Sequence, residues 1–191
     1  NYTPRDLLGR PSMLNIDGNT VAQQGYITDE LTGYAVDWLA GGDRTSPFLL
    51  YIAHKGVHAP FTPAPRHRGT LTANATNLPV ARAGTEPGTP MWVQNQRNSW
   101  HGVDFAYHDD VDLSEFRRDY RETLRAIDDS VASLRETLER TGELDNTIIF
   151  VTSDNGFLLG EHGLIDKRNA YEASMRVPMI VWGPAYLRAA G

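Results

Sequence analysis

The first hydrophobic pattern in the chain predicts a helix. Between residues 31 and 39, apolar side chains recur at intervals of three and four, which places them on one face of a helix. Thr28 precedes this segment and is the expected N-cap, because its hydroxyl can accept a backbone hydrogen bond. Gly41 and Gly42 are expected to end the helix.

A longer helix is expected from Ser114 to about Arg140. Its apolar residues recur mostly at steps of three and four, so they form one apolar face. Ser114 is the candidate N-cap, and Gly142 is expected to terminate the helix.

Short apolar runs predict strands at residues 47–53, 147–152 and 177–182. Such runs are typical of strands that a sheet buries on both faces. The longer helix lies between the first two strands, which predicts an α/β fold with a mostly parallel sheet flanked by helices. Residues 54–112 lack sustained periodicity and are rich in Pro, Gly, Asn and Thr, so we expect a long functional loop or an insertion there.

The composition is that of a folded domain. The chain has 191 residues, of which 40% are hydrophobic and 22% charged, enough for one domain with a buried core. Its net charge of -6 argues against nucleic acid as a partner. Within these 191 residues, the absence of cysteine excludes disulfides, thiolate metal sites and cysteine nucleophiles. No apolar run is long enough for a membrane span, and the chain starts without methionine or the apolar core of a signal peptide, so we expect an upstream piece to be missing or removed.

Asp154 and Asn155 stand side by side directly after the expected strand 147–152, and Gly156 allows a sharp turn there. Hard cations such as Ca²⁺ or Mg²⁺ take carboxylate and amide oxygens as ligands. An Asx turn that leads out of the strand explains the same residues.

Two further polar segments belong to this picture: residues 54–60 follow the expected strand 47–53, and residues 161–168 lie within one loop of Asp154. Ligands of parallel sheets bind at the carboxyl ends of strands. A cation, imidazoles and an ammonium gathered there would suit a sulfate or phosphate ester: the cations offset charge on the non-bridging oxygens, and a histidine can protonate the leaving alkoxide. Taken singly, each histidine is explained as well by a surface or structural role.

Several segments share their order and spacing with a known family. They are P-F-L-L-Y-I-A-H-K-G-V-H-A-P-F at 47–61, A-I-D-D-S-V at 126–131, G-E-L-D-N-T-I-I-F-V-T-S-D-N-G at 142–156, G-E-H-G-L-I-D-K-R at 160–168 and Y-E-A-S-M-R-V-P-M-I-V-W-G-P at 171–184. Together they resemble the type I sulfatases of the alkaline phosphatase superfamily. The resemblance implies an alkaline phosphatase-like fold, a formylglycine nucleophile and Ca²⁺ in preference to Mg²⁺.

The resemblance also assigns roles to residues of this chain. Asp154 and Asn155 would be two of the Ca²⁺ ligands. Lys167 would contact both the sulfate and the nucleophile, and His58 would bind the sulfate ester and assist the leaving group.

By the same resemblance, the substrate would be a sulfated sugar, a glycosaminoglycan or a mucin glycan. Residues 141–156 and 165–172 are similar to enzymes that remove 6-O-sulfate from N-acetylglucosamine, and iduronate-2-sulfatases are a nearby alternative. His162 would hold substrate or pocket structure. Trp100 and His101 could face the sugar, although a loop anchored by a buried tryptophan is the slightly better explanation of Trp100. Family members usually act in the periplasm, the lysosome or outside the cell, so export is expected from the resemblance.

One family motif is absent from the sequence. The formylglycine arises from Cys or Ser in a C/S-x-P-x-R motif upstream of the matching segments, and neither that motif nor the paired upstream aspartates of the Ca²⁺ site occur here. We therefore expect residues 1–191 to be the C-terminal part of a sulfatase catalytic domain, incomplete at the N-terminus, with the missing N-terminal part as its partner. A phosphonate or phosphodiester hydrolase of the same superfamily and a non-catalytic binding module remain alternatives.

Overall fold

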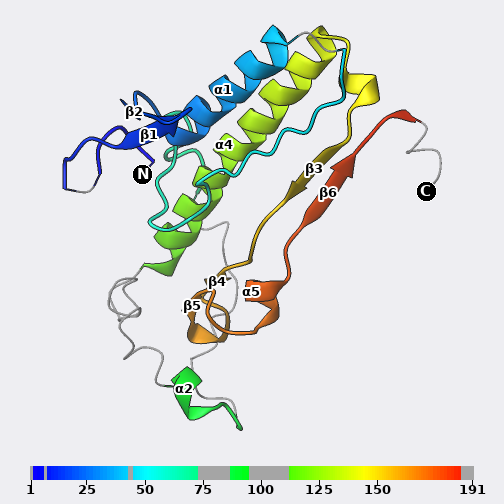
Figure 1. Cartoon of the computed structure of the whole chain (residues 1–191). Coiled ribbons are helices and arrows are strands. Elements are labelled where there is room, and N and C mark those ends of the chain that lie inside the picture. Colours follow the sequence, from blue (N-terminus) through cyan, green and yellow to red (C-terminus); the bar gives the residue numbers. More distant parts are fainter. Residues whose placement is uncertain (1, 7, 43–44, 73–86, 95–111, 186–191) are drawn as a thin grey trace. The chain divides into compact units, whose positions relative to one another are not determined.

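The computed structural model describes residues 2–6, 8–42, 45–72, 87–94 and 112–185, and it contains both helices and strands (Figure 1). The elements follow the order β1 (Met13–Ile16), β2 (Asn19–Ala22), α1 (Ile27–Gly41), α2 (Met91–Gln94), α4 (Leu113–Arg140), η3 (Leu144–Asn146), β3 (Ile149–Thr152), β4 (Leu158–Leu159), η4 (Glu161–Gly163), β5 (Ile165–Asp166), α5 (Glu172–Met175) and β6 (Met179–Trp182).

The chain forms two compact units. The first comprises residues 1–71, 119–147 and 183–191, and the second comprises residues 72–118 and 148–182. Within the described residues, no helix is long and apolar enough to cross a membrane.

The first predicted helix is confirmed as α1, but its cap differs from the expectation. Tyr26 occupies the N-cap position, and Thr28 lies buried inside the first turn. The carboxylate of Glu30 reaches back instead, and its Oε1 accepts hydrogen bonds from the backbone N–H groups of Gln24 at 2.5 Å and Gly25 at 2.8 Å. A side chain within the helix thus supports the turn that leads into it.

The second predicted helix is confirmed as α4, again with a different cap. Oδ1 of Asp112 accepts the backbone N–H of Ser114 at 2.8 Å, so Asp112 caps the helix and Ser114 does not. Gly142 ends the helix as expected, with a φ of 76°. The N–H of Glu143 donates to the carbonyl of Leu138 at 2.8 Å, which is the hydrogen bond of a Schellman cap.

The α/β class is confirmed, but the strand pairing of the described residues differs from the expectation. β1–β2, β3–β6 and β4–β5 are all antiparallel, and residues 47–53 form no strand in the described structure. The reason lies in the connection between β3 and β6. It carries only short elements and lacks the crossover helix that usually joins parallel neighbours.

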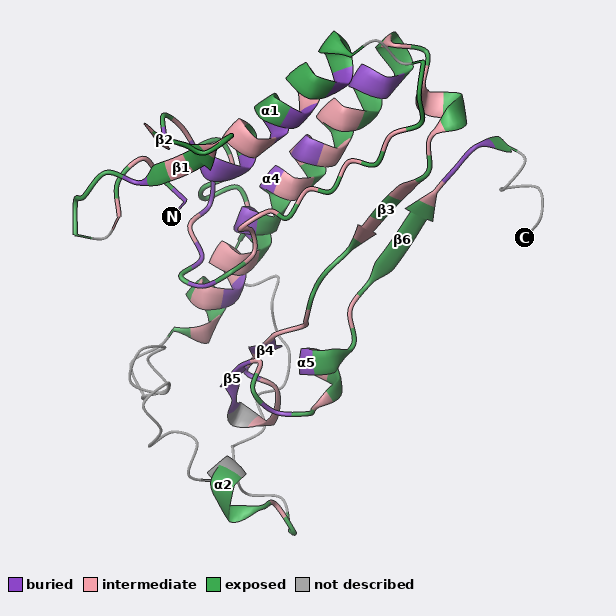
Figure 2. Cartoon of the chain, in the orientation of Figure 1, coloured by how far each residue is buried: buried purple, intermediate pink, exposed green. Residues whose placement is uncertain are grey.

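The apolar strands are uncovered in the described structure, contrary to the burial expected on both faces. Met179 is 68% exposed, Ile180 60% and Val181 54% in β6, and Phe150 of β3 is 59% exposed (Figure 2). Leu49 is 91% exposed. Strands of this composition normally have both faces covered, so these side chains present apolar surface that can bind another segment or chain.

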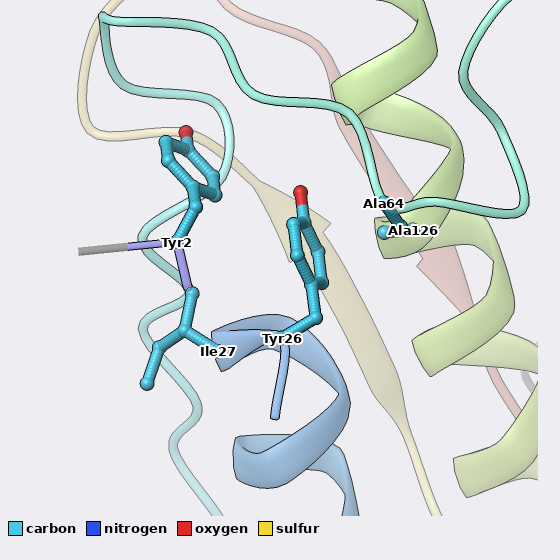
Figure 3. Close-up of a cluster of buried hydrophobic side chains, with 5 residues drawn as sticks. All are labelled: Tyr2, Tyr26, Ile27, Ala64 and Ala126. Carbon is cyan, nitrogen blue, oxygen red and sulfur yellow. The ribbon is translucent and has the colours of Figure 1, made fainter. Parts of the chain in front are cut away.

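Each unit has its own small core. In the first unit, Tyr2, Tyr26, Ile27, Ala64 and Ala126 form a buried cluster (Figure 3). The rings of Tyr2 and Tyr26 stack with their centroids 5.8 Å apart. The core of the second unit is formed by the fully buried Leu158 and Leu164 on either side of the β4–β5 turn.

An ion-pair network joins α1 to α4 within the first unit. Arg66 forms a bidentate pair with Asp29 of α1 at 2.7 and 2.8 Å, and its Nε lies 2.7 Å from Asp129 of α4. His67 Nε2 contacts the same carboxylate at 2.7 Å. Burial alone would raise the pKa of Asp129, but the hydrogen bonds from His67 and Arg66 lower it below its usual range.

Candidate functional site

The loop after β3 presents Asp154 and Asn155 at the end of the strand. Asp154 is exposed and Asn155 is half-buried. The N–H of Gly156 donates to the carbonyl of Ser174 at 2.8 Å, and a Cβ at position 156 would overlap the carbonyl oxygen of Ala173. Glycine is therefore required by the close approach of α5, which fixes the loop that carries the two candidate ligands.

Lys167 and Asn155 come together in the second unit. Nζ of Lys167 donates to Oδ1 of Asn155 at 3.2 Å, and Nδ2 of Asn155 donates to the carbonyl of Gly156 at 2.6 Å. Both ends of the amide are thus engaged, and the orientation of Asn155 is fixed by its neighbours.

The backbone around Lys167 is tightly held. β5 pairs with β4 and ends at Asp166, which has a φ of 110° and is 1% exposed. Its carboxylate forms an ion pair with the guanidinium of Arg168. A non-glycine residue at this φ is strained, and the ion pair between the buried carboxylate and the exposed Arg168 helps to stabilise it beside Lys167.

His162 lies in η4 with a φ of 54°. Its ring stacks on Tyr171 with centroids 3.9 Å apart and an interplanar angle of 16°. The turn before it is held by Leu159, whose carbonyl accepts from Arg117 Nε and whose N–H donates to the Glu161 carboxylate, both at 2.6 Å. These contacts give the imidazole a defined place in the second unit.

His58 is an exposed residue of the first unit. Its Nδ1 lies 2.7 Å from the carbonyl oxygen of Ala59. Because a carbonyl only accepts, we assign the proton to Nδ1, and Nε2 is then the nitrogen available to a ligand.

The expected site residues are therefore distributed over both units. Asp154, Asn155, His162 and Lys167 belong to the second unit, and the contact between Asn155 and Lys167 is the one that the structure establishes. The placement of His58 beside them stays a prediction. Trp100 and His101, the expected sugar-facing residues, lie outside the described residues.

The residues of the second unit suit a hard cation only in part. Asp154 and Asn155 offer oxygen atoms of the kind that Ca²⁺ takes, but the ion needs about six to eight of them. Within the described parts of the chain, no group of three or more His, Asp or Glu could hold a metal ion. The two residues can thus supply a fraction of a coordination shell.

The comparison with protein families decides what kind of chain this is. Residues 3–189 match the family model described as Sulfatase. The chain belongs to the sulfatase family. Sulfatases in general use a formylglycine and a divalent metal.

Three matches illustrate the relationship. An N-acetylglucosamine-6-O-sulfatase of Bacteroides thetaiotaomicron is 30% identical over 91% of this sulfatase chain and 41% of its own length. A solved structure, in complex with its substrate D-glucosamine-2-N,6-O-disulfate, matches with a TM-score of 0.71 and 28% identity, over 96% of this chain and 47% of the other. The phosphonate monoester hydrolase of Agrobacterium radiobacter shares the fold, with a TM-score of 0.65 and 22% identity over 82% of this chain and 33% of its own.

These matches confirm the expected alkaline phosphatase-like fold. The sulfatase chain spans less than half the length of the curated relatives that it matches.

Sequence reasoning missed the residues that hold the site in place. Tyr171, Arg117 and Tyr2 each contact a candidate residue or the turn that carries it. Tyr171 lies inside one of the segments that resemble sulfatases, which could have drawn attention to it. For Tyr2 and Arg117 no motif gave a signal, because their contacts exist only in the folded chain.

Proposed function

We propose that this chain is part of an enzyme that hydrolyses sulfate esters of a sulfated carbohydrate, with 6-O-sulfated N-acetylglucosamine or glucosamine as the substrate. The observation behind the proposal is the contact between Lys167 and Asn155. It joins the lysine that is expected to bind the sulfate to a residue that is expected to bind the metal ion. Family membership and the named relatives support the reaction type and the sugar.

Asp154 and Asn155 would contribute a carboxylate and an amide oxygen to a Ca²⁺ site, and Ca²⁺ fits better than Mg²⁺, which demands a stricter geometry. The bound ion would offset negative charge on the sulfate oxygens. The remaining ligands and the formylglycine would come from outside these 191 residues, which contain no cysteine.

Lys167 binds the sulfate group in this proposal. Its ammonium is a compact charge with three donors, so it can hold Asn155 Oδ1 and a sulfate oxygen at the same time. Nε2 of His58 binds the ester and, when the imidazole is charged, protonates the leaving alkoxide to give the alcohol. His162, with Trp100 and His101, contacts the sugar.

A phosphonate or phosphodiester hydrolase is the second candidate, and the shared fold of the phosphonate monoester hydrolase favours it. Both classes need cations around a tetrahedral anion. The higher identity of the sugar sulfatase relatives favours the sulfate ester. A non-catalytic binding module would keep the scaffold without turnover.

A chimera tests the proposal. This chain would replace the aligned region of the Bacteroides thetaiotaomicron N-acetylglucosamine-6-O-sulfatase, and the host would supply the nucleophile. We expect release of sulfate from 6-O-sulfo-N-acetylglucosamine, little release from a phosphonate monoester, and no turnover by the isolated chain. Preferred turnover of the phosphonate would favour the second candidate. A folded chimera that binds the sulfated sugar without turnover would favour the binding module.

A further inference from the structure

A single phenol oxygen holds the backbone of His58. The hydroxyl of Tyr2 donates to the carbonyl of His58 at 2.7 Å and accepts the N–H of His58 at 2.8 Å. The carbonyl of Lys55 lies 3.2 Å from the same oxygen. Both backbone polar groups of His58 are thus tied to one side chain that is 56 residues away in sequence.

Tyr2 is itself fixed in place. It is 4% exposed, its ring stacks on Tyr26 (Figure 3), and the ammonium of Lys55 lies 5.6 Å from the ring centroid, within the range of a cation–π contact. Burial raises the pKa of Tyr2 to about 12. The hydroxyl therefore keeps its proton at neutral pH and can donate and accept at once, as its two bonds with His58 require.

The ring of His58 depends on the same stretch of backbone. Nδ1 donates to the carbonyl of Ala59, the next residue, at 2.7 Å. The carbonyl of Ala59 belongs to the following peptide, and the His58–Ala59 peptide, whose oxygen Tyr2 holds, carries the Cα of Ala59. A shift of the His58–Ala59 peptide would therefore displace Ala59 together with this acceptor and release the ring. Whatever fixes that peptide also fixes the imidazole tautomer that leaves Nε2 for a ligand.

We propose that Tyr2 is a positioning residue for His58: it holds the His58 backbone and, through the carbonyl of Ala59, the tautomer and orientation of the imidazole. The link to sulfate ester hydrolysis rests on the proposed function, since only there does His58 meet the ester. Tyr2 lies outside every segment that resembles the sulfatase motifs.

The test uses the 191-residue chain with ¹⁵N-labelled histidine. Tyr2→Phe removes the hydroxyl and keeps the ring. Tyr26→Phe is the matched control, because it removes a hydroxyl of the same cluster whose bond goes to the carbonyl of Thr62 at 2.9 Å. We expect Tyr2→Phe to shift the His58 ring nitrogens from the Nδ1–H tautomer towards a mixture, and to speed exchange of the His58 amide about 10-fold through the lost hydrogen bond. The control should change neither.

Wild-type tautomer and wild-type amide exchange in a folded Tyr2→Phe variant would overturn the proposal, and so would an equal shift in both variants. If Tyr2→Phe does not fold, amide exchange in the wild-type chain tests the hydrogen bond between Tyr2 and His58. Its His58 amide should be protected by the bond to Tyr2, and exchange at the rate of a free amide would refute that bond. None of these readouts needs turnover, so an inactive chimera with an intact Tyr2 effect would count against the proposed function alone.

Discussion

The ammonium of Lys167 lies 3.2 Å from Oδ1 of Asn155, although 12 residues separate the two in sequence. The contact joins the residue after the β4–β5 hairpin to the loop after β3. It places a compact positive charge beside an oxygen expected to bind a cation, so an anion that approaches this loop would meet more than one positive group.

Loss of the Lys167 charge should strongly reduce turnover. We expect Lys167→Met to lower kcat/KM for the sulfated sugar in the chimera by at least about 100-fold, the typical effect of removing a group that stabilises transition-state charge. Lys167→Arg keeps the charge but not the compact ammonium, so it should retain part of the activity. Full activity of Lys167→Met would show that the lysine does not bind the sulfate.

Gly156 should tolerate no side chain, because a Cβ there meets the backbone of α5. We expect Gly156→Ala to lower the free energy of unfolding by about 1–3 kcal/mol in urea denaturation. Gly33→Ala is the control, since nothing lies within 4 Å of its Cβ in α1, and it should raise the stability by up to about 1 kcal/mol. Equal effects of the two substitutions would contradict the tight packing at Gly156.

The half-buried imidazole of His54 should make stability depend on pH. Burial lowers the pKa of His54 from its ordinary value of 6.5, and Nε2 lies 3.0 Å from the hydroxyl of Ser130. On acidification, the unfolded chain takes up this proton before the folded chain does. The contribution to stability is therefore complete above pH 6.5 and is lost as the pH falls from there through the lower pKa of the folded state.

We expect the free energy of unfolding of the wild-type chain to fall over that pH window, and to fall less in His54→Gln. Urea titrations at a series of pH values measure both slopes. Identical slopes would show that His54 does not carry the effect.

The uncovered strand β6 should promote association of the isolated chain. The monomer has a mass of 21.3 kDa, and light scattering after gel filtration should show larger species, because exposed apolar strands recruit other chains. Ile180→Lys should reduce them several-fold. Leu8→Lys is the control, since Leu8 is 75% exposed but lies outside the strands. A monomeric wild-type chain would contradict this prediction.

Helices were predictable from the sequence because their apolar spacing is a local property. Their caps were not, since neighbouring polar side chains compete for the same N–H groups: Asp112 caps α4 in place of Ser114, and Glu30 replaces Thr28 at α1. The positions of β3 and β6 were predictable from their apolar runs. Their antiparallel pairing was not, because it depends on the path of the connection.

The loops that carry the candidate residues were predictable where they follow local signals, and the roles of these residues stay predictions. The Asp154–Asn155 pair after a strand and the I-D-K-R segment pointed to the loops that the structure joins through Lys167. The contacts of Tyr2 and Tyr171 could not be predicted, because the sequence around an aromatic residue does not show which histidine it contacts in the fold. The assignments of Trp100 and His101 stay predictions.

The most direct measurement is sulfate release from 6-O-sulfo-N-acetylglucosamine by the chimera that carries this chain. With Asp154→Ala we expect kcat/KM to fall by at least about 100-fold, with activity partly restored by excess Ca²⁺. With Asp145→Ala, an exposed carboxylate of η3, we expect no change. Unaltered sulfate release by Asp154→Ala would contradict the assignment of this loop to the sulfatase site.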